Sequence, residues 1–246
     1  MMNNFNKIEI LKKQLVANNV RFKDFGSIIE MNILKKESSM LKKNVSEYLL
    51  KNINEFYNLK IKKISSLKNL EKYTKNLPNI TPNGVIKLRK ENIKKYKIIF
   101  KQIMKIIKKK KILQNVHLIE PIEIRLMKTN KSNYNYNRPY SSSKIHSDSW
   151  AGNPLELKIC FFVMGDKKNN LEFFKPNKID KNFFKKKPNY DSAIKKYGYK
   201  KLKKINFKKI TIFDSAILHK TNNKNCGFRI SIDFGIILSR DFSKNK

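Results

Sequence analysis

The spacing of apolar residues changes near the middle of the chain, and this change constrains the fold more than any other feature. From Leu41 to Phe56 apolar residues recur every three or four positions, which is the spacing of one helix face. After Val116 the apolar runs are short and are separated by turn residues such as Gly152-Asn153-Pro154. We therefore expect helices in the first half of the chain and strands in the second.

A second helix is predicted to begin at Thr81-Pro82, because a capping residue followed by proline is typical of a helix N-terminus. Its apolar face continues from Ile93 to Ile107 in steps of three and four. The lysine run at 108–111 is expected to end it, since cations stabilise a helix C-terminus. We interpret residues 1–112 as a mainly helical region whose helices pack on the rest of the protein.

The second half of the chain is predicted to form the core from several short strands. The expected strands are 116–127 (broken by Pro121), 155–164, 171–174, 210–213 and 229–238. Short strands separated by turns indicate an antiparallel barrel or jelly roll, and the fold class is therefore α+β. Residues 113–246 would be this core. They include a lysine-rich insertion at about 177–204 that is either a lid or a solvated loop with one short helix.

The formal net charge of +37 is the most unusual feature of the composition. Dense positive charge favours phosphate and hence a nucleic-acid partner. Only six of the 56 basic residues are arginine, however, and arginine is the residue that pairs bidentately with phosphate and guanine. Lysine, asparagine and isoleucine are frequent throughout, which is typical of an adenine- and thymine-rich genome. A nucleic-acid partner is therefore not favoured.

Several classes of protein are excluded on simple grounds. No run of about 18 uncharged apolar residues is present, so no membrane span is expected. The first residues lack the apolar stretch of a signal peptide, and a cytoplasmic location is expected. Two cysteines, Cys160 and Cys226, are too few for a disulfide framework or a cysteine zinc site.

Two of the three histidines belong to a pattern that predicts a metal site. His146 and Asp148 are two positions apart, and in a strand such residues point to the same face. His219 closes an apolar segment just before an asparagine-rich turn. Two histidines and one carboxylate on one side of a metal are the facial triad of non-haem iron oxygenases. The third histidine, His117, has no partner at ligand spacing and is interpreted as structural.

A carboxylate site is predicted ten residues after the last of these histidines. Arg229 and Ser231 share one face of the expected strand 229–238. A guanidinium group beside a hydroxyl is well suited to hold a carboxylate.

Three segments that carry these residues resemble the iron(II)/2-oxoglutarate-dependent dioxygenase superfamily: IHSDSW (145–150), FDSAILHKTNN (213–223) and RISIDFGI (229–236). The likeness covers roughly residues 115–238. More narrowly, the chain looks like bacterial oxygenases of sporadic carbohydrate-biosynthesis clusters, which are related to the phytanoyl-CoA hydroxylase group. The resemblance implies a double-stranded β-helix, or jelly-roll, core with the N-terminal helices packed on it.

The same resemblance implies the cofactors and their ligands. Iron(II) would bind His146, Asp148 and His219, and 2-oxoglutarate would chelate the iron and pair its far carboxylate with Arg229 and Ser231. Molecular oxygen would be the second cosubstrate, and hydroxylation of a small molecule the usual outcome. A sugar or saccharide precursor is the expected substrate, and an anionic substrate is one option.

Four further residues are weaker candidates for the substrate pocket. Trp150 is two positions past Asp148, and Tyr140 precedes the metal motif. Arg125 and Arg138 are unusual in a lysine-dominated chain and could contact the 2-oxo acid or an anionic substrate. A core, loop or surface role is the alternative for each of the four.

Two other functions remain open. The charge motivates oxidative demethylation of nucleic acid, although the demethylases of this superfamily typically carry a second arginine where this chain has Gly235. A non-catalytic binding module on the same scaffold is the other alternative. The intact triad disfavours it.

Overall fold

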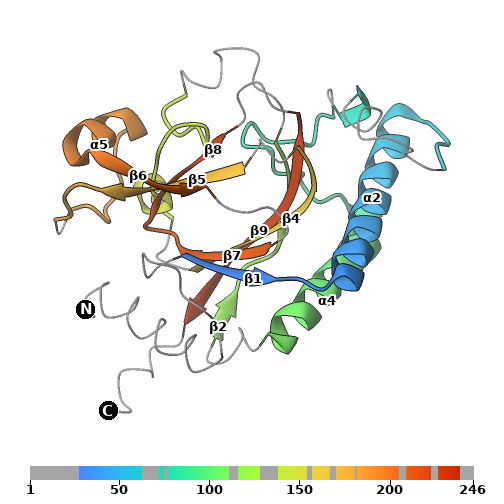
Figure 1. The fold of residues 1–246 in the computed structure, drawn as a ribbon. Helices are drawn as coiled ribbons and strands as arrows, with labels where there is room; N and C mark the ends of the chain where they lie inside the picture. The colour runs from blue at the N-terminus through green and yellow to red at the C-terminus, as the bar shows by residue number, and fades with distance from the viewer. Residues whose placement is uncertain are drawn as a thin grey trace.

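The protein combines two antiparallel sheets with helices, and its fold class is therefore α+β, as expected (Figure 1). The computed structural model describes residues 28–62, 72–74, 77–110, 116–127, 138–153, 157–166, 170–180, 182–204, 209–222 and 227–238. Within these residues no helix is both long and apolar enough to cross a bilayer.

The larger sheet has six strands, all paired antiparallel. Its order is β1-β7-β4-β9-β2, and β3 pairs with β9 as well. The strands are β1 (Ile28–Asn32), β2 (Val116–Ile119), β3 (Glu123–Met127), β4 (Leu157–Gly165), β7 (Lys209–Asp214) and β9 (Arg229–Leu238). The smaller sheet has the order β6-β5-β8, with β5 (Asn170–Pro176), β6 (Tyr199–Lys204) and β8 (Leu218–Asn222).

One face of the larger sheet packs against two helices, α2 (Lys35–Tyr57) and α4 (Ile93–Lys109). Figure 1 shows both helices on the same side of this sheet. Alternate residues of each strand point to the helices. Isoleucine is the most frequent residue at these positions. The buried strand residues of this layer include Ile124, Leu126, Ile159, Phe161, Ile210, Ile212, Ile230, Ile232 and Phe234. The opposite face of the same strands is more polar, and it carries the site described below.

The first predicted helix is confirmed. Leu41, Val45, Leu49 and Ile53 are buried on one face of α2, as their spacing predicted. Phe56, at the end of the same pattern, is 38% exposed instead. It lies in the last turn of the helix, where Tyr57 packs against the core in its place.

The predicted start of the second helix at Thr81-Pro82 was wrong. Residues 81–84 form a tight turn in which the Thr81 hydroxyl accepts a hydrogen bond from Val85 N at 3.0 Å. Gly84 ends this turn with φ +83°, a conformation that glycine adopts without strain. Helix α4 begins only at Ile93, after a 3₁₀ turn at Lys90–Asn92 (η1). Its end at Lys109, within the lysine run, matches the prediction.

All five predicted strand segments are found, and Pro121 separates β2 from β3. The sequence pattern missed β1, which comes from the first 112 residues and pairs with β7 from Ile28↔Phe213 onward. It also missed β6, which lies inside the segment 177–204, and β8, which carries His219.

The segment 177–204 is tied to the rest of the protein by aromatic packing. Its helix α5 (Tyr190–Tyr197) is capped by Asn189, whose side chain accepts from Ser192 N at 2.8 Å. Phe183, Tyr190 and Tyr197 form a buried cluster with Trp150. The lysine-rich segment therefore packs against the rest of the protein through its aromatic residues.

Candidate metal centre and the adjoining cavity

His146 and His219 are joined through their backbones. His146 N donates to His219 O at 2.9 Å, and His219 N donates to His146 O at 2.8 Å. His219 belongs to β8, and His146 meets it as an isolated antiparallel bridge. This pairing places side by side two imidazoles that are far apart in the sequence.

Asp148 points to the same side as His146, although the expected strand is not formed here. Asp148 opens a 3₁₀ turn (η3, Asp148–Ala151), and the residue before it, Ser147, is extended, with φ −106° and ψ 139°. One extended residue is enough to bring positions 146 and 148 to the same side. The backbone N of Asp148 is held by Ser215 O at 2.9 Å.

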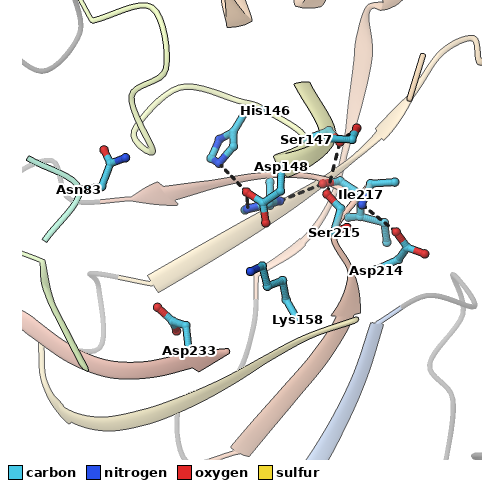
Figure 2. Close-up of polar contacts among 12 residues, drawn as sticks. Asn83, His146, Ser147, Asp148, Lys158, Asp214, Ser215, Ile217 and Asp233 are labelled. Carbon is cyan, nitrogen blue, oxygen red and sulfur yellow. Dashed lines mark hydrogen bonds and ion pairs between the residues drawn. The ribbon is translucent and has the colours of Figure 1, made fainter. Parts of the chain in front are cut away.

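The three side chains converge on one point. The Nε2 atoms of His146 and His219 lie 3.6 Å and 3.7 Å from Oδ1 of Asp148, and the candidate ligand atoms of all three residues are within 4.8 Å of one another. Figure 2 shows the imidazole of His146 directed at the Asp148 carboxylate. Ligand atoms about 2.1 Å from a shared ion lie about 3 Å apart when they occupy adjacent positions. A small inward movement would therefore close this arrangement around a metal.

The hydrogen bonds of the imidazoles prepare both rings for metal binding. Nδ1 of His146 lies 2.8 Å from Lys144 O, and Nδ1 of His219 lies 2.8 Å from Ile217 O. A carbonyl oxygen can only accept, so each Nδ1 carries the proton. Each Nε2 then presents its lone pair to the shared point, as metal-binding histidines do.

The protonation states also suit a cation. Burial, and then the neighbouring His146, lower the pKa of His219 to about 4, while Asp148 opposes both effects. Burial raises the pKa of Asp148, but the two imidazoles beside it outweigh this and bring it below its usual value. At neutral pH His219 is therefore a neutral donor and Asp148 an anionic one.

Aromatic rings surround the two histidines. The ring of Tyr190 stacks on His146 with centroids 4.6 Å apart and an interplanar angle of 13°. Phe213 contacts His219 edge-on at 5.1 Å. Tyr190 comes from α5, so the segment 177–204 reaches the candidate metal centre directly. Burial, and then the charge of Asp148, raise the pKa of the Tyr190 hydroxyl, which is therefore neutral.

A cavity of about 320 Å³ adjoins the three residues and lies between the two sheets. Ligand pockets range from about 300 to 1,000 Å³, so this one suits a small ligand. Its lining residues are Glu120, Pro121, Ile122, Glu123, Arg125, Ser142, His146, Asp148, Lys158, Ile159, Cys160, Leu171, Phe213, His219, Thr221, Arg229, Asp233 and Phe234.

Arg229 lines this cavity and is only 3% exposed. Burial lowers the pKa of its guanidinium group. Ser231 lies on the same face of β9 and is fully buried, and its hydroxyl has no hydrogen-bond partner among the described residues. A buried hydroxyl of this kind normally has a partner. A carboxylate reaching between Arg229 and Ser231 would supply one.

The four weaker candidates lie in different places. Arg125 lines the cavity, where Asp233 and Glu123 hold its guanidinium at 2.7 Å and 2.6 Å. Trp150 is fully buried in the aromatic cluster, and its indole donates to Phe183 O at 2.7 Å. Tyr140 donates to Lys187 O at 2.8 Å.

Trp150, Tyr140 and Arg138 are not among the residues that line the cavity. Nη1 of Arg138 is buried and has no hydrogen-bond partner in the described part of the chain. Of the four candidates, the structure thus brings only Arg125 to the cavity. His117 lies in β2, and its side chain is outside the described part.

Lys158 and Glu120 are among the polar residues of the cavity that sequence reasoning missed. Lys158 is the one charged residue of β4, in the run LKICFFVMG. A charge inside a strand that is otherwise apolar was the signal that could have singled it out. Glu120 precedes Pro121 and carried no comparable signal.

Comparisons with known proteins give structural likenesses at low sequence identity. No protein-family model and no curated protein sequence matches the chain. Similar solved structures include AviO1 from Streptomyces viridochromogenes, at 8% identity and TM-score 0.42, covering 93% of this chain and 95% of that one. A prolyl hydroxylase from Trichoplax adhaerens has 10% identity and TM-score 0.38, with 98% and 93% covered. The non-haem α-ketoglutarate-dependent carbocyclase SnoK of nogalamycin biosynthesis has 7% identity and TM-score 0.49, with 85% and 79% covered.

Proposed function

We propose that the protein is an iron(II)- and 2-oxoglutarate-dependent oxygenase that hydroxylates a small molecule. One observation carries the proposal. The two Nε2 atoms and one carboxylate that converge at His146, His219 and Asp148 face a cavity that also contains the buried guanidinium of Arg229. A two-histidine, one-carboxylate set with open positions is the ligand arrangement that non-haem iron oxygenases use.

Each residue has a defined task in this proposal. His146 and His219 donate lone pairs from Nε2, and their Nδ1–H groups stay bonded to backbone carbonyls, which fixes the rings. Asp148 supplies negative charge. Arg229 and Ser231 bind the far carboxylate of the 2-oxo acid, and this orients it toward the histidines.

The apolar part of the cavity wall excludes water. Phe213, Leu171 and Cys160 are the residues concerned. Bound iron(II), with the 2-oxo acid and oxygen, would supply the oxidising power that attacks an unactivated C–H bond, which no side chain can do.

The fold is compatible with this function. We propose that the two facing sheets are the two halves of a double-stranded β-helix, with residues 113–246 as its main part. Helices α2 and α4 then act as a packing layer that stiffens the larger sheet. Taken alone, the motif resemblance favours a sugar or saccharide precursor as substrate, whereas the charges of the cavity wall favour the class argued in the next subsection.

Oxidative demethylation of nucleic acid is the weaker alternative. Among the described lining residues four are acidic and three basic, whereas the whole chain has 19 acidic and 56 basic residues. The positive charge of the chain is therefore not concentrated at the cavity. The convergence of the three candidate ligands also disfavours a non-catalytic binding module.

The decisive experiment is a visible absorption spectrum recorded without oxygen. Metal-free protein is mixed with iron(II), and 2-oxoglutarate is then added. A weak charge-transfer band should appear in the wild-type protein and be absent from His219→Ala, while Lys201→Met, a change outside the cavity, should keep it. Iron binding without the band would contradict the cosubstrate assignment, and no iron binding at all would contradict the metal site.

A further inference from the structure

The cavity is rich in acidic groups for such a basic protein. Glu120, Glu123 and Asp233 line it in addition to Asp148, which we assign to the metal. The lysine-rich composition cannot explain acidic residues that gather at one place. Acidic groups at this wall disfavour a large polyanionic substrate, such as a nucleic acid, through like-charge repulsion.

Two of these acids, Asp233 and Glu123, already bind the side chain of Arg125. The guanidinium of Arg125 donates to Asp233 at 2.7 Å and to Glu123 at 2.6 Å, and its third nitrogen donates to Asn83 O at 3.0 Å. This group ties β3 to β9 and to the turn that contains Gly84. One guanidinium between two carboxylates leaves one net negative charge at this wall.

The remaining pair, Lys158 and Glu120, is held less tightly than the Arg125 group. Nζ of Lys158 lies 3.3 Å from Oε2 of Glu120, and their side chains are 20% and 33% exposed. The same Oε2 accepts from Gly235 N at 3.1 Å, so the Glu120 carboxylate is held in place by backbone as well. Figure 2 shows the side chain of Lys158 pointing toward Asp148. The positive charge of Lys158 also helps to lower the pKa of Asp148.

This pair therefore offers one cation and one anion side by side, close to the candidate metal centre. A ligand with a single charge would match only one member of this pair. A neutral sugar would offer charge to neither. A small zwitterion would exchange the one ion pair for two, because its anionic group can bind Lys158 while its ammonium group binds Glu120. The extra negative charge at Arg125 favours the ammonium further.

We propose that Lys158 and Glu120 form the substrate-recognition site for a small zwitterion of the amino-acid class. Lys158 binds the carboxylate and Glu120 the ammonium. Because Lys158 points toward Asp148, a substrate anchored there presents its nearest carbon atoms to the metal centre. This inference rests on the proposed oxygenase function for its catalytic meaning, but the binding site itself can be tested without turnover.

The test measures the binding of free L-amino acids by titration calorimetry, to protein with iron(II) and 2-oxoglutarate and to metal-free protein. Every amino acid that binds is compared with its N-acetyl derivative and its carboxamide. The wild-type protein should bind the free form about 10- to 100-fold more tightly than either derivative, which is the scale of a hydrogen bond to a charged group. A neutral monosaccharide panel is titrated in parallel.

Two variants separate recognition from a structural role of the ion pair. Glu120→Gln should remove the preference for a free amine but keep the preference for a free carboxylate. Lys158→Met should do the reverse. Lys201→Met is the matched control, since it breaks a Lys–Glu pair in the smaller sheet, 3.5 Å from Glu172, and should change neither preference.

Four results would overturn the proposal. The first two are the absence of any amino-acid binding and binding that is indifferent to both blocking groups. The other two are variants that lower thermal stability while both preferences persist, and binding of a neutral sugar that neither variant affects. The spectrum with iron(II) and 2-oxoglutarate is recorded for each variant, so a failure of the oxygenase assignment is seen separately from a failure of zwitterion binding.

Discussion

His146 and His219 exchange two backbone hydrogen bonds, at 2.9 Å and 2.8 Å, and their ring centroids are 4.4 Å apart. The bridge orients both rings before any metal arrives. A site of this kind is organised by the fold, and metal bound to it stabilises the segments that carry it. Metal binding and folding are therefore thermodynamically linked.

Iron(II), or manganese(II) as an oxygen-stable substitute, should raise the midpoint of thermal unfolding. At a free metal concentration 100 times the Kd the gain is about 2.7 kcal/mol, which corresponds to several degrees for a chain of this size. Asp148→Asn should abolish most of the shift. Asp191→Asn, at a position 62% exposed, is the matched control and should keep it. An equal shift in both variants would show that the metal binds elsewhere.

The stability of the metal-free protein should depend on the protonation of His219. Its pKa is lowered to about 4 in the folded protein, whereas a histidine in an unfolded chain titrates near 6.5. Between these two pH values the unfolded state therefore binds more protons than the folded state. The contribution of His219 to the free energy of unfolding is consequently highest above pH 6.5 and decreases as the pH falls toward 4. The loss is roughly 3 kcal/mol. Urea unfolding between pH 4.5 and 7 measures it.

His219→Gln is the variant that tests the assignment of this pH dependence. It removes the titrating group and keeps a polar side chain of similar size. Its free energy of unfolding should change less with pH in the same window. A slope equal to that of the wild-type protein would assign the titration to another group.

The affinity for 2-oxoglutarate should depend on the shape of the Arg229 side chain as well as its charge. Arg229→Gln removes a buried partner of the carboxylate and should weaken binding at least about 30-fold, since such losses cost about 2–5 kcal/mol. Arg229→Lys keeps the charge without the planar fork and should restore binding only in part. Arg89→Gln changes an exposed arginine and is the control.

Metal affinity should be the same in all three arginine variants. Calorimetry with 2-oxoglutarate measures the cosubstrate, and a metal titration provides the comparison. Full binding in Arg229→Gln would place the far carboxylate elsewhere in the cavity.

Gly165 lies opposite Arg229 in the pairing of β4 with β9, and its conformation excludes a side chain. It has φ +128°, and a Cβ atom there would lie 2.2 Å from Phe228 O and 2.7 Å from Cα of Arg229. Gly165→Ala should therefore lower the free energy of unfolding by at least about 1–3 kcal/mol and weaken cosubstrate binding.

Gly152→Ala is the matched control for Gly165→Ala. Gly152 also has a positive φ, of +91°, but the nearest atom to an added Cβ is Lys186 Cδ at 3.4 Å. This variant should lose about 1 kcal/mol from backbone strain and keep the cosubstrate affinity. Denaturant unfolding and calorimetry with 2-oxoglutarate on both variants show whether cosubstrate binding depends on the position of Gly165 beside Arg229 or only on the strain of a positive φ.

The candidate metal residues could be selected from the sequence because their spacing is local. A single extended residue between His146 and Asp148 is enough to align their side chains, so the two lie on the same side as expected, although the expected strand proved to be a bridge and a 3₁₀ turn. Arg229 and Ser231 followed in the same way from the alternation along β9. These inferences needed only the rule that side chains two residues apart in a strand point to the same face.

The features that were missed depend on packing between distant segments. Strand β1 is recognisable only through its pairing with β7. Tyr190 reaches His146 because α5 packs on the aromatic cluster around Trp150. Thr81-Pro82 looked like a helix start, but Gly84 lets the chain turn so closely to β3 that Gly84 O accepts from Leu126 N at 2.7 Å. No local propensity encodes such contacts.

The stacking of Tyr190 on His146 leads to the last prediction, which concerns metal affinity. The Tyr190 ring is 4% exposed and lies nearly parallel to the imidazole, with an interplanar angle of 13°. It restricts rotation of His146 about its side-chain bonds, and outer partners that orient a ligand typically change metal affinity 10- to 100-fold. Tyr190→Leu should therefore weaken metal binding by about 10-fold.

Tyr190→Phe distinguishes stacking from any effect of the hydroxyl group. Phenylalanine keeps the flat ring, so metal affinity in this variant should stay within about twofold of the wild-type value if ring stacking is responsible. A metal titration of both variants, with thermal unfolding to check that α5 still packs, gives the answer. If Phe weakens binding as much as Leu, the hydroxyl orients the site, and the stacked ring has no role of its own. If neither variant changes the affinity, the backbone bridge to His219 alone is sufficient to hold His146 in place.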